Sequence, residues 1–572
     1  MRIESRVLPE QLPDLGDLPP LLTRLYAARG VRSAAELDRS LKSLLPVSLF
    51  KGMDQAVKVL REALEQRQSI LIVGDFDCDG ATASAVAVLG LRAMGAARVD
   101  YLVPNRFEYG YGLTPEIVEV ALEREPQVLV TVDNGISSVD GVAAARAAGL
   151  KVVVTDHHLP GERLPEADAI VNPSQPGCDF PSKSIAGVGV IFYVLMALRA
   201  ELRGMGWFTA RRPEPNLGEL LDLVALGTVA DVVPLDANNR ILVHQGLARI
   251  RAGRCRPGIR ALLEVARRPA ERLASTDLGF IIGPRLNAAG RLDDMSLGIE
   301  CLLTDDEQLA LDMARELDSL NRDRKSIEQD MQQQALTMLD ETGFQDSDLP
   351  FGLCLFDPQW HQGVIGILAS RLKERYHRPV IAFADAGDGQ IKGSARSVSG
   401  LHIRDALDSV AAANPGLISK FGGHAMAAGL SMPAEHFEAF REAFDREVRR
   451  QLCAEDLTGR LLCDGELTPE EFNLQLAMAL RDAGPWGQHF PEPGFHGHFN
   501  LIQQRLVGER HLKMVLQPDG ATELLDAIAF NIDPQIWPDP SIRQVRLVYS
   551  LDVNEYRGRQ SLQLMVRHLQ AC

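Results

Sequence analysis

Short apolar runs alternate with helical patterns in the first part of the chain, from residue 69 onward. The expected strands are 69–73, 99–103, 127–132 and 151–155, and the helices expected between them are 81–94, 115–124 and 138–148. Strands made almost entirely of valine, isoleucine and leucine, separated by helices, are typical of a parallel sheet covered on both faces. The sequence therefore predicts an α/β domain around such a sheet.

Acidic and imidazole side chains directly follow three of these runs. They lie in Asp75-Phe76-Asp77-Cys78-Asp79-Gly80, Thr131-Val132-Asp133-Asn134-Gly135 and Thr155-Asp156-His157-His158. A fourth segment, Gly227-Thr228-Val229-Ala230-Asp231, is expected to end a buried strand in the same way. Because parallel sheets bind ligands in the crevice beyond the carboxyl ends of their strands, we expect these side chains to meet at one site.

Carboxylates and neutral imidazole are ligands that Mg²⁺ and Mn²⁺ accept. If the backbone stays extended, the carboxylates of Asp75, Asp77 and Asp79 share one face, where they repel one another unless cations lie between them. Gly80 then allows a sharp turn into the next helix. A calcium-binding loop would need a glutamate near its twelfth position, where the chain has Val86. The pattern favours metal-assisted hydrolysis of a phosphoester.

Taken singly, these segments have less specific explanations. Asp133 is compatible with an Asx turn, and the paired histidines with exposed residues near a helix start. Asp231 is harder to explain in this way, because a carboxylate flanked by apolar residues is costly to bury without a partner or a metal ion. Their joint occurrence predicts one shared dinuclear site.

Composition sets the class of protein. A chain of 572 residues is expected to form two to four domains. It has no apolar run long enough to cross a bilayer, no secretory signal is expected, and its eight cysteines include no Cys-x-x-Cys pair, which favours the reducing cytoplasm. The net charge of −17 does not exclude a nucleic-acid partner, because phosphate binding depends on local basic surface.

Changes of pattern divide the chain into five segments. The expected segments are an N-terminal arm (1–50), the α/β domain with the metal site (51–304), a long connecting helix (305–345), a second α/β domain (346–455) and a β-barrel of the OB type (456–572). An arginine-rich run at 244–272 is compatible with a face that guides a nucleic-acid strand or with a solvated helix face.

Together these motifs resemble those of a known superfamily. Asp-x-Asp-x-Asp-Gly, Val-Asp-Asn-Gly, Asp-His-His and Val-Ala-Asp are similar to the four motifs of the DHH phosphoesterases, and Gly-Gly-His-Ala-Met-Ala-Ala-Gly at 422–429 is similar to the signature of their companion DHHA1 domain. Segments 105–112, 283–291 and 360–366 resemble the bacterial RecJ family in particular. The resemblance implies that 51–304 is a DHH domain and 346–455 a DHHA1 domain.

The resemblance also implies roles for the matching residues. One metal ion would be held by Asp75, Asp77 and Asp133. A second would be held by Asp79, Asp133, His157 and Asp231. His158 would face the substrate phosphate, which completes the seven expected catalytic residues. Many DHH phosphoesterases have histidine at the first ligand position, so whether Asp75 binds its ion directly or through water stays open.

Eight further residues are expected to bind substrate. They offer guanidinium groups, aromatic surface or closely approaching backbone to a phosphate or a base. They are Arg106, Tyr109, Arg285, Asn287, Arg291, Gly422, Gly423 and His424. The alternative for the aromatic loop is an ordinary core patch, and for the glycine-rich segment a packing role.

The implied activity is 5′→3′ degradation of single-stranded DNA to 5′-mononucleotides, with two Mn²⁺ or Mg²⁺ ions, in recombination and repair. Single-stranded DNA is the expected partner, together with single-strand-binding protein and a helicase, and the chain is expected to be a monomer. Two alternatives stay open: a DHH phosphoesterase acting on short oligonucleotides or cyclic dinucleotides, and a non-catalytic DNA-binding scaffold.

Overall fold

The computed structural model describes residues 1–105, 109, 112–341, 349–508, 510–556 and 558–572. The chain divides into two compact units. The larger unit comprises Ser5–Asp318 and Leu462–Cys572, and the smaller one comprises Met1–Glu4 and Ser319–Leu461. Among the described residues, no helix is long and apolar enough to cross a membrane.

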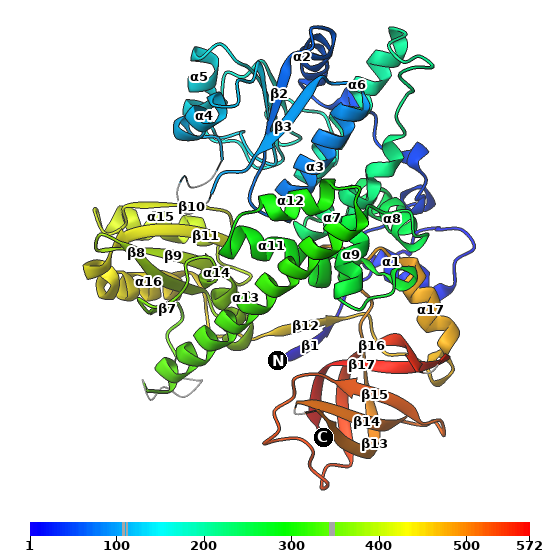
Figure 1. Ribbon diagram of the computed structural model, residues 1–572. Helices are drawn as coiled ribbons and strands as arrows, with labels where there is room; N and C mark the ends of the chain where they lie inside the picture. Colours follow the sequence, from blue (N-terminus) through cyan, green and yellow to red (C-terminus); the bar gives the residue numbers. More distant parts are fainter. Residues whose placement is uncertain (106–108, 110–111, 342–348, 509, 557) are drawn as a thin grey trace. The chain divides into compact units, whose positions relative to one another are not determined.

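The larger unit contains the predicted parallel sheet (Figure 1). Its strands, in spatial order, are β3 (Arg98–Leu102), β2 (Ser69–Val73), β4 (Val128–Val132), β5 (Lys151–Thr155) and β6 (Ala169–Val171). Every neighbouring pair is parallel. All five residues of β2 and of β4 are buried, as their apolar sequences require when both faces of a sheet are covered.

Helices cover both faces of this sheet. On one face, α4 (Pro115–Leu122) and α5 (Val139–Ala147) pack with Leu71, Leu129 and Val152 in one buried cluster. The helices that contact the strands from the other face are α2 (Met53–Glu65), α3 (Cys78–Ala93) and α6 (Gly187–Gly204). The small side chains of α3 allow it to pack closely, and thirteen of its residues are buried.

Two local expectations for this region are wrong. Gly227–Asp231 does not end a strand, because helix α7 (Leu221–Ala230) includes most of it and Asp231 is the helix C-cap. A helix that is apolar all round has no amphipathic period, so a short apolar run cannot be distinguished from a strand by sequence. Likewise, Asp75, Asp77 and Asp79 do not form one extended face: Asp77 is the N-cap of α3, so Asp79 and Gly80 lie inside its first turn.

Further helices complete this part of the larger unit. They are α1 (Pro20–Ala27), α8 (Ala237–Arg251), α9 (Pro257–Val265), α10 (Ser275–Asp277), α11 (Gly283–Leu292), α12 (Ser296–Leu303) and α17 (Leu474–Ala483). A π-helical turn, Leu278–Ile282, connects α10 to α11. Helix α13 (Glu307–Glu341) is the expected long connecting helix, and the chain passes from the larger to the smaller unit along it.

The C-terminal segment forms the expected barrel. The closed order is β13-β14-β15-β17-β16, with only β15 and β17 paired in parallel. The strands are β13 (Phe495–Val507), β14 (His511–Pro518), β15 (Leu525–Ala529), β16 (Gln544–Tyr556) and β17 (Arg559–Ala571). Buried and partly buried residues alternate strictly along β14, as one interior and one outer face require.

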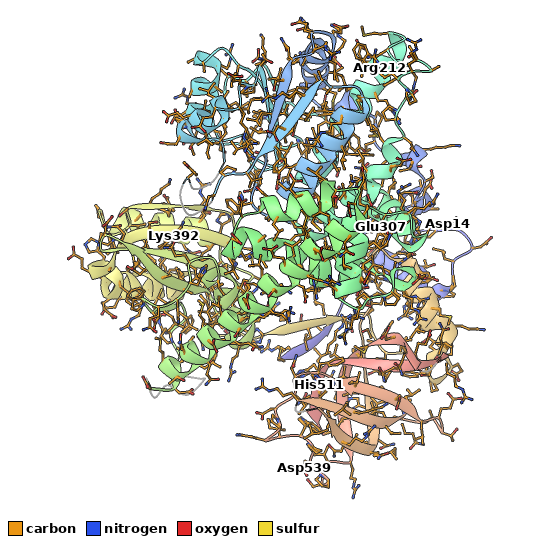
Figure 2. The ribbon with its side chains drawn as sticks, in the orientation of Figure 1. Asp14, Arg212, Glu307, Lys392, His511 and Asp539 are labelled. Carbon is orange, nitrogen blue, oxygen red and sulfur yellow. The ribbon has the colours of Figure 1, made fainter. Side chains whose placement is uncertain are left out.

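The smaller unit has its own five-stranded sheet. Its order is β10 (Lys420–Gly423), β11 (Ala427–Pro433), β9 (Gln390–Arg396), β8 (Val380–Gly387) and β7 (Leu353–Phe356). Only β7 and β8 are parallel. Lys392 on β9, labelled in Figure 2, is exposed, whereas its neighbours Ile391 and Gly393 are buried.

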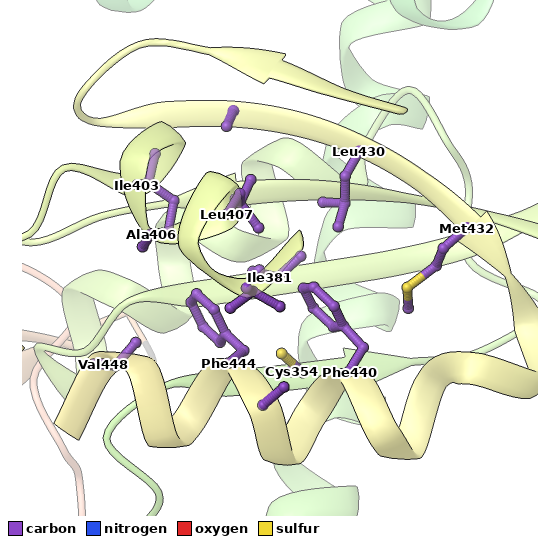
Figure 3. Packing of buried hydrophobic residues seen from close by; sticks show 14 of the residues in the cluster. Cys354, Ile381, Ile403, Ala406, Leu407, Leu430, Met432, Phe440, Phe444 and Val448 are labelled. Carbon is purple, nitrogen blue, oxygen red and sulfur yellow. The ribbon is translucent and has the colours of Figure 1, made fainter. Parts of the chain in front are cut away.

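Helices α14 (Ile365–Tyr376), α15 (Ile403–Ala413) and α16 (Phe437–Gln451) pack with this sheet. Figure 3 shows Phe440 and Phe444 of α16 directed toward Ile381 of β8 and Cys354 of β7, within one apolar core. Met1–Glu4 belongs to this unit through β1 (Arg2–Ser5), which pairs with β12 (Arg460–Cys463). A self-contained core explains why this segment forms a separate unit.

Candidate metal centre

The acidic residues meet where the strand order of the parallel sheet reverses. After β2 the chain adds β3 on one side of that strand and then β4 on the other. Helix α3, which follows β2, and helix α5, which follows β4, cover opposite faces of the sheet, and open α/β sheets bind ligands at such a reversal point. Asp75 follows β2 and Asp133 follows β4, and both are buried.

Donor atoms from all the predicted metal ligands converge at this place. Three sets each have their donor atoms within 4.8 Å of one another: Asp75, Asp77 and Asp133; Asp79, His157 and Asp231; and Asp133, His157 and His158. His157 Nε2 lies 3.1 Å from Asp133 Oδ1 and 3.5 Å from Asp231 Oδ2. The four segments, separated by up to about 150 residues in sequence, thus form one cluster, as expected.

Backbone geometry holds Asp133 in the cluster. Its φ is 62°, a left-handed conformation that is uncommon outside glycine and better tolerated by Asp and Asn. Its N–H donates to Thr155 O at the end of β5, at 3.1 Å. The amide of Asn134 donates to Val73 O and to Val132 O, which ties together the ends of β2 and β4. The loop after β4 therefore holds Asp133 beside the carboxyl ends of its two neighbouring strands, β2 and β5.

Helix α6 fixes the orientation of Asp79. Its side-chain oxygens accept hydrogen bonds from the N–H groups of Gly187, at 2.7 Å, and Val188, at 3.0 Å. These N–H groups lie at the helix N-terminus, which favours negative charge. Asp79 is fully buried, so these bonds compensate part of the cost of keeping its carboxylate away from water.

Crowding makes the carboxylates hard to ionise together. Burial and the charge of Asp77 raise the pKa of Asp79 to about 7, although the N–H groups of Val188 and Gly187 act against the rise. Burial also raises the pKa of Asp133 and Asp231 well above the usual range, and the charges of Asp79 and Asp77 add to that rise. The buried Oδ2 of Asp231 accepts no hydrogen bond from the described residues. Divalent cations would offset this repulsion and would satisfy these oxygens.

Asp156 orients the second histidine. Its Oδ1 accepts from the backbone N–H groups of His157 and His158 and lies 2.7 Å from His158 Nδ1, and its Oδ2 accepts from the N–H of Ile136. Burial would lower the pKa of His158, but the hydrogen bond and charge of Asp156, with the charges of Asp75 and Asp77, raise it to about 9. Asp156 therefore positions the imidazole of His158.

Two of the expected substrate-binding residues make structural contacts within the larger unit. Asn287 Oδ1 accepts a hydrogen bond from the N–H of Cys78, at 2.7 Å, and so fixes the first turn of α3. Arg285 donates to Asp318 Oδ1 and to Ile281 O, which holds α11 against α13. Both residues therefore act on the shape of the site, whatever they also do for substrate.

The other expected substrate-binding residues are placed as follows. Tyr109 is half-buried and packs against the core cluster under α4 and α5, and Arg106 lies outside the described residues. Arg291 lies in the last turn of α11. In the smaller unit, Gly422 and Gly423 end β10, and the N–H of His424 donates to Ala427 O across the turn to β11.

The sequence interpretation missed the residues that support the predicted metal ligands. Two of them act through their backbone N–H groups: Gly187 and Val188 donate to Asp79. A third, Asn134, acts through its side-chain amide, which donates to the backbone carbonyl of Val73. Gly290 belongs to the site as well, since a Cβ there would lie 1.9 Å from Phe76 O. The sequence offers one indication of these contacts, the glycines in Ala186-Gly187-Val188-Gly189 and Ala289-Gly290. Glycine permits another segment to approach the backbone closely, but it does not indicate which segment does so.

Comparisons with known proteins agree with this arrangement. Residues 69–228 match the DHH family, N-terminal domain, residues 350–450 the DHHA1 domain, and residues 463–568 the RecJ OB domain. The single-stranded-DNA-specific exonuclease RecJ of Escherichia coli strain K12 is 58% identical over 570 residues, which cover 100% of this chain and 99% of that protein. This chain belongs to the RecJ family. A more distant RecJ, from Bacillus subtilis strain 168, is 32% identical over 561 residues, covering 96% of this chain and 68% of that protein.

Solved structures of the RecJ family have the same fold and carry metal ions. The crystal structure of Thermus thermophilus RecJ with Mn²⁺ has a TM-score of 0.82 and 31% identity, covering 100% of this chain and 80% of that one. The structure with Mg²⁺ has a TM-score of 0.76 and 29% identity, covering 100% and 78%. The carboxylate and imidazole donors found here are of the kinds that both ions accept.

Proposed function

We propose that the chain is a metal-dependent exonuclease that hydrolyses single-stranded DNA in recombination and repair. The observation that carries the proposal is the convergence of three donor sets at the reversal point of the sheet. The support from comparison is 58% identity to the single-stranded-DNA-specific exonuclease RecJ of E. coli over the whole chain. The resemblance to this family further suggests 5′→3′ polarity and release of 5′-mononucleotides.

We assign the ligands as the donor sets suggest. Asp75, Asp77 and Asp133 would hold one ion. Asp79, Asp133, His157 and Asp231 would hold the other, with Asp133 shared between them. The ions would supply an activated water and neutralise charge that develops on the phosphate. The spacing of the donor atoms supports these sets, and Asp133 occurs in two of the three.

The remaining parts of the site would position the substrate. His158, held by Asp156, would donate a hydrogen bond to a non-bridging phosphate oxygen. Asn287 and the N-terminus of α6 would keep Asp77 and Asp79 in place. Our candidates for contacts with the DNA backbone and bases remain Arg106, Tyr109, Arg285, Asn287, Arg291, Gly422, Gly423 and His424.

We extend the proposal to domains, partners and location. The division into arm (1–50), DHH domain (51–304), connecting helix (305–345), DHHA1 domain (346–455) and OB domain (456–572) is supported by the order of the three matched family domains. Single-strand-binding protein and a helicase are proposed partners, and a monomer is the proposed state. Eight free cysteines agree with a cytoplasmic location.

A substitution at the shared ligand tests the function. Asp133→Asn keeps a side chain that tolerates the left-handed backbone but removes the charge. Release of nucleotides from a 5′-phosphorylated single strand in Mn²⁺ should fall by more than the roughly 10–100-fold that loss of an outer-shell partner costs. The matched control is Asp140→Asn, an exposed carboxylate on α5. Turnover within a few-fold of the unsubstituted chain would contradict the ligand assignment.

A substrate comparison separates the proposal from its alternatives. A long single strand should be degraded faster than a dinucleotide, and a chelator should abolish both reactions. Faster hydrolysis of the dinucleotide would indicate a small-substrate phosphoesterase. Absence of any metal-dependent hydrolysis would indicate a DNA-binding scaffold, although the complete donor sets argue against that outcome.

A further inference from the structure

A cavity in the larger unit lies at the far ends of α3 and α7, two helices that reach the metal centre. Its volume is about 480 Å³. Helix α3 carries Asp79 in its first turn, and its last turns contribute Leu89, Gly90 and Ala93 to the cavity wall. Helix α7 carries Asp231 at its C-terminal end. The turn before its N-terminal end, Leu217–Leu220, forms another part of the cavity wall. We call this space the distal cavity.

The distal cavity accounts for part of the arginine-rich run at 244–272. Several arginines of that run are committed to structural contacts: Arg251 donates to Leu273 O, Arg256 donates to carbonyls at the end of α12, and Arg260 pairs with Glu307. Arg249 and Arg254 line the cavity, as does part of Arg256. Arg251, Arg256 and Arg260 therefore have packing roles, whereas Arg249 and Arg254 are available to the cavity.

Arg249 and Arg254 offer hydrogen-bond donors to the cavity. Arg249 donates through Nη2 to Arg254 O, but its buried Nε has no acceptor among the described residues. The guanidinium of Arg254 is exposed and makes no hydrogen bond or ion pair within the described part of the chain. The donors that a ligand in the cavity can reach are therefore the exposed guanidinium of Arg254 and the terminal nitrogens of Arg249, and guanidinium groups suit anionic ligands.

The acidic residues of the wall do not cancel these donors. Glu214 forms ion pairs with Arg203 and, at 3.5 Å, with Arg199, so its charge is paired with arginines other than Arg249 and Arg254. Glu219 is exposed on the rim, where its carboxylate can accept from an amino group. Asn216 and Arg256 also line the cavity, but their side chains bond to backbone groups, and Leu89, Ala93 and Leu217 belong to the apolar part of the wall. Small-molecule sites of roughly 300–1,000 Å³ combine apolar walls with few placed polar groups in this way.

We propose that the distal cavity binds a 5′-mononucleotide and that its occupancy changes the metal affinity of the catalytic centre. The phosphate would lie between Arg249 and Arg254, since paired guanidinium groups suit phosphate oxygens. The base would lie on the apolar wall near Leu89 and Leu217, with an exocyclic amino group toward Glu219. A free phosphate would leave the apolar wall unused, and a nucleoside would leave the arginines unpaired.

Close packing provides the link from the distal cavity to the metal ligands. At Gly227 a Cβ would lie 2.2 Å from Thr82 Oγ1 and 2.8 Å from Asp79 Oδ1, so the backbone of α7 touches α3 directly beside a ligand. Helix α3 has 16 residues, roughly 24 Å of rise, and such elements move as rigid bodies. A ligand that separates the distal ends of α3 and α7 would thus shift Asp79 relative to Asp231.

Direct binding tests the site without depending on catalysis. The full chain in EDTA is titrated by calorimetry with 2′-deoxyadenosine 5′-monophosphate, 2′-deoxyadenosine and inorganic phosphate. The monophosphate should bind one-to-one and more tightly than either fragment. Arg254→Gln, an exposed position, should weaken binding by roughly tenfold or more, and Arg249→Gln/Arg254→Gln by more still. The control is Arg260→Gln, which should bind as the unsubstituted chain does.

Two results would overturn the site. One is no binding of the monophosphate. The other is binding that Arg254→Gln and the double variant leave unchanged while circular dichroism shows both folded, which would place the nucleotide at the metal centre. Equal affinity for inorganic phosphate would also exclude a mononucleotide site, because the apolar wall would then contribute nothing.

Mn²⁺ titration tests the coupling, which rests on the proposed function. Saturating monophosphate should change the Mn²⁺ affinity by roughly fivefold or more, and Mn²⁺ should change the monophosphate affinity by the same factor. The double variant should keep its basal nuclease rate and lose the coupling. An unchanged Mn²⁺ affinity would overturn the regulatory role. Binding without any nuclease activity would contradict the proposed function, and nuclease activity without binding would contradict the distal cavity.

Discussion

Single hydrogen bonds connect the segments that carry the proposed metal ligands to residues far away in sequence. Asn287, 209 positions from Cys78, accepts the N–H at the start of α3 and thereby orients Asp77 and Asp79. Asn287→Ala should lower the free energy of unfolding by about 1–2 kcal/mol, because a helix-terminal N–H loses its acceptor. It should also weaken Mn²⁺ binding by roughly 10–100-fold. Asn287→Asp, which keeps an acceptor, is the matched control in calorimetric unfolding and Mn²⁺ titration.

The Mn²⁺ affinity of these variants shows whether Asn287 supports the metal site or binds substrate. If Asn287 acted only on DNA, both variants would bind Mn²⁺ as the unsubstituted chain does and would differ only in KM. Normal Mn²⁺ affinity in Asn287→Ala would therefore contradict the supporting role.

Burial of one histidine predicts acid sensitivity. Burial lowers the pKa of His244 from 6.5 to about 4, and the charges of Arg39 and Arg251 add to the effect. The unfolded chain binds this proton below about pH 6.5, whereas the folded chain does not until about pH 4, so stability falls as the pH falls between those values. His244→Gln should remove about 1–2 kcal/mol of that fall, a figure reduced for solvent screening because the ring is only half-buried.

The measurement is urea unfolding at pH 7 and pH 4.5. His498→Gln, at an exposed histidine, is the control and should leave the difference between the two pH values unchanged. An identical difference for His244→Gln and the unsubstituted chain would show that His244 titrates normally.

At the scale of elements, α11 and the loop after β2 are in backbone contact. A Cβ on Gly290 would lie 1.9 Å from Phe76 O, and a backbone atom cannot move aside as a flexible side chain can. Gly290→Ala should therefore displace α11 from the metal loop, destabilise the chain by about 1–3 kcal/mol and reduce nuclease activity. Gly204→Ala in α6, with nothing within 4 Å, should instead be neutral or stabilising by up to about 1 kcal/mol. Equal thermal stability of the two variants would contradict the contact.

In the smaller unit, a buried carboxylate joins two helices. Glu328 of α13 accepts from Arg324, at 2.7 Å, and from Arg371 of α14, at 2.8 Å. Glu328→Gln should lower the free energy of unfolding by about 2–4 kcal/mol, because the nearly buried Arg324 would lose its counter-charge. Asp330→Asn, exposed on the same helix, is the control and should change stability by less than about 0.5 kcal/mol in urea unfolding.

The elements show what sequence could and could not predict. The strands before Asp75, Asp133 and His157 were predictable because a buried parallel strand is apolar throughout, and the polar residue that ends it stands out. The sequence predicts Asp231 as a metal ligand at the end of a strand, and the structure places it at the end of a helix, because the surrounding run is apolar in either conformation. Contacts such as Asn287 with Cys78 or Arg285 with Asp318 depend on tertiary packing, which no local pattern encodes.

At the scale of the whole molecule, every assigned metal ligand lies in the larger unit, whereas the smaller unit has its own core. Ligands that bind only the folded state stabilise the unit that binds them, by about 2.7 kcal/mol at a concentration of 100 Kd. Scanning calorimetry should therefore resolve two transitions, of which Mn²⁺ raises only one. EDTA should reverse that shift, and Asp133→Asn should abolish it while leaving the other transition unchanged. A Mn²⁺-dependent shift of both transitions by the same amount would show that the two units unfold as one cooperative body.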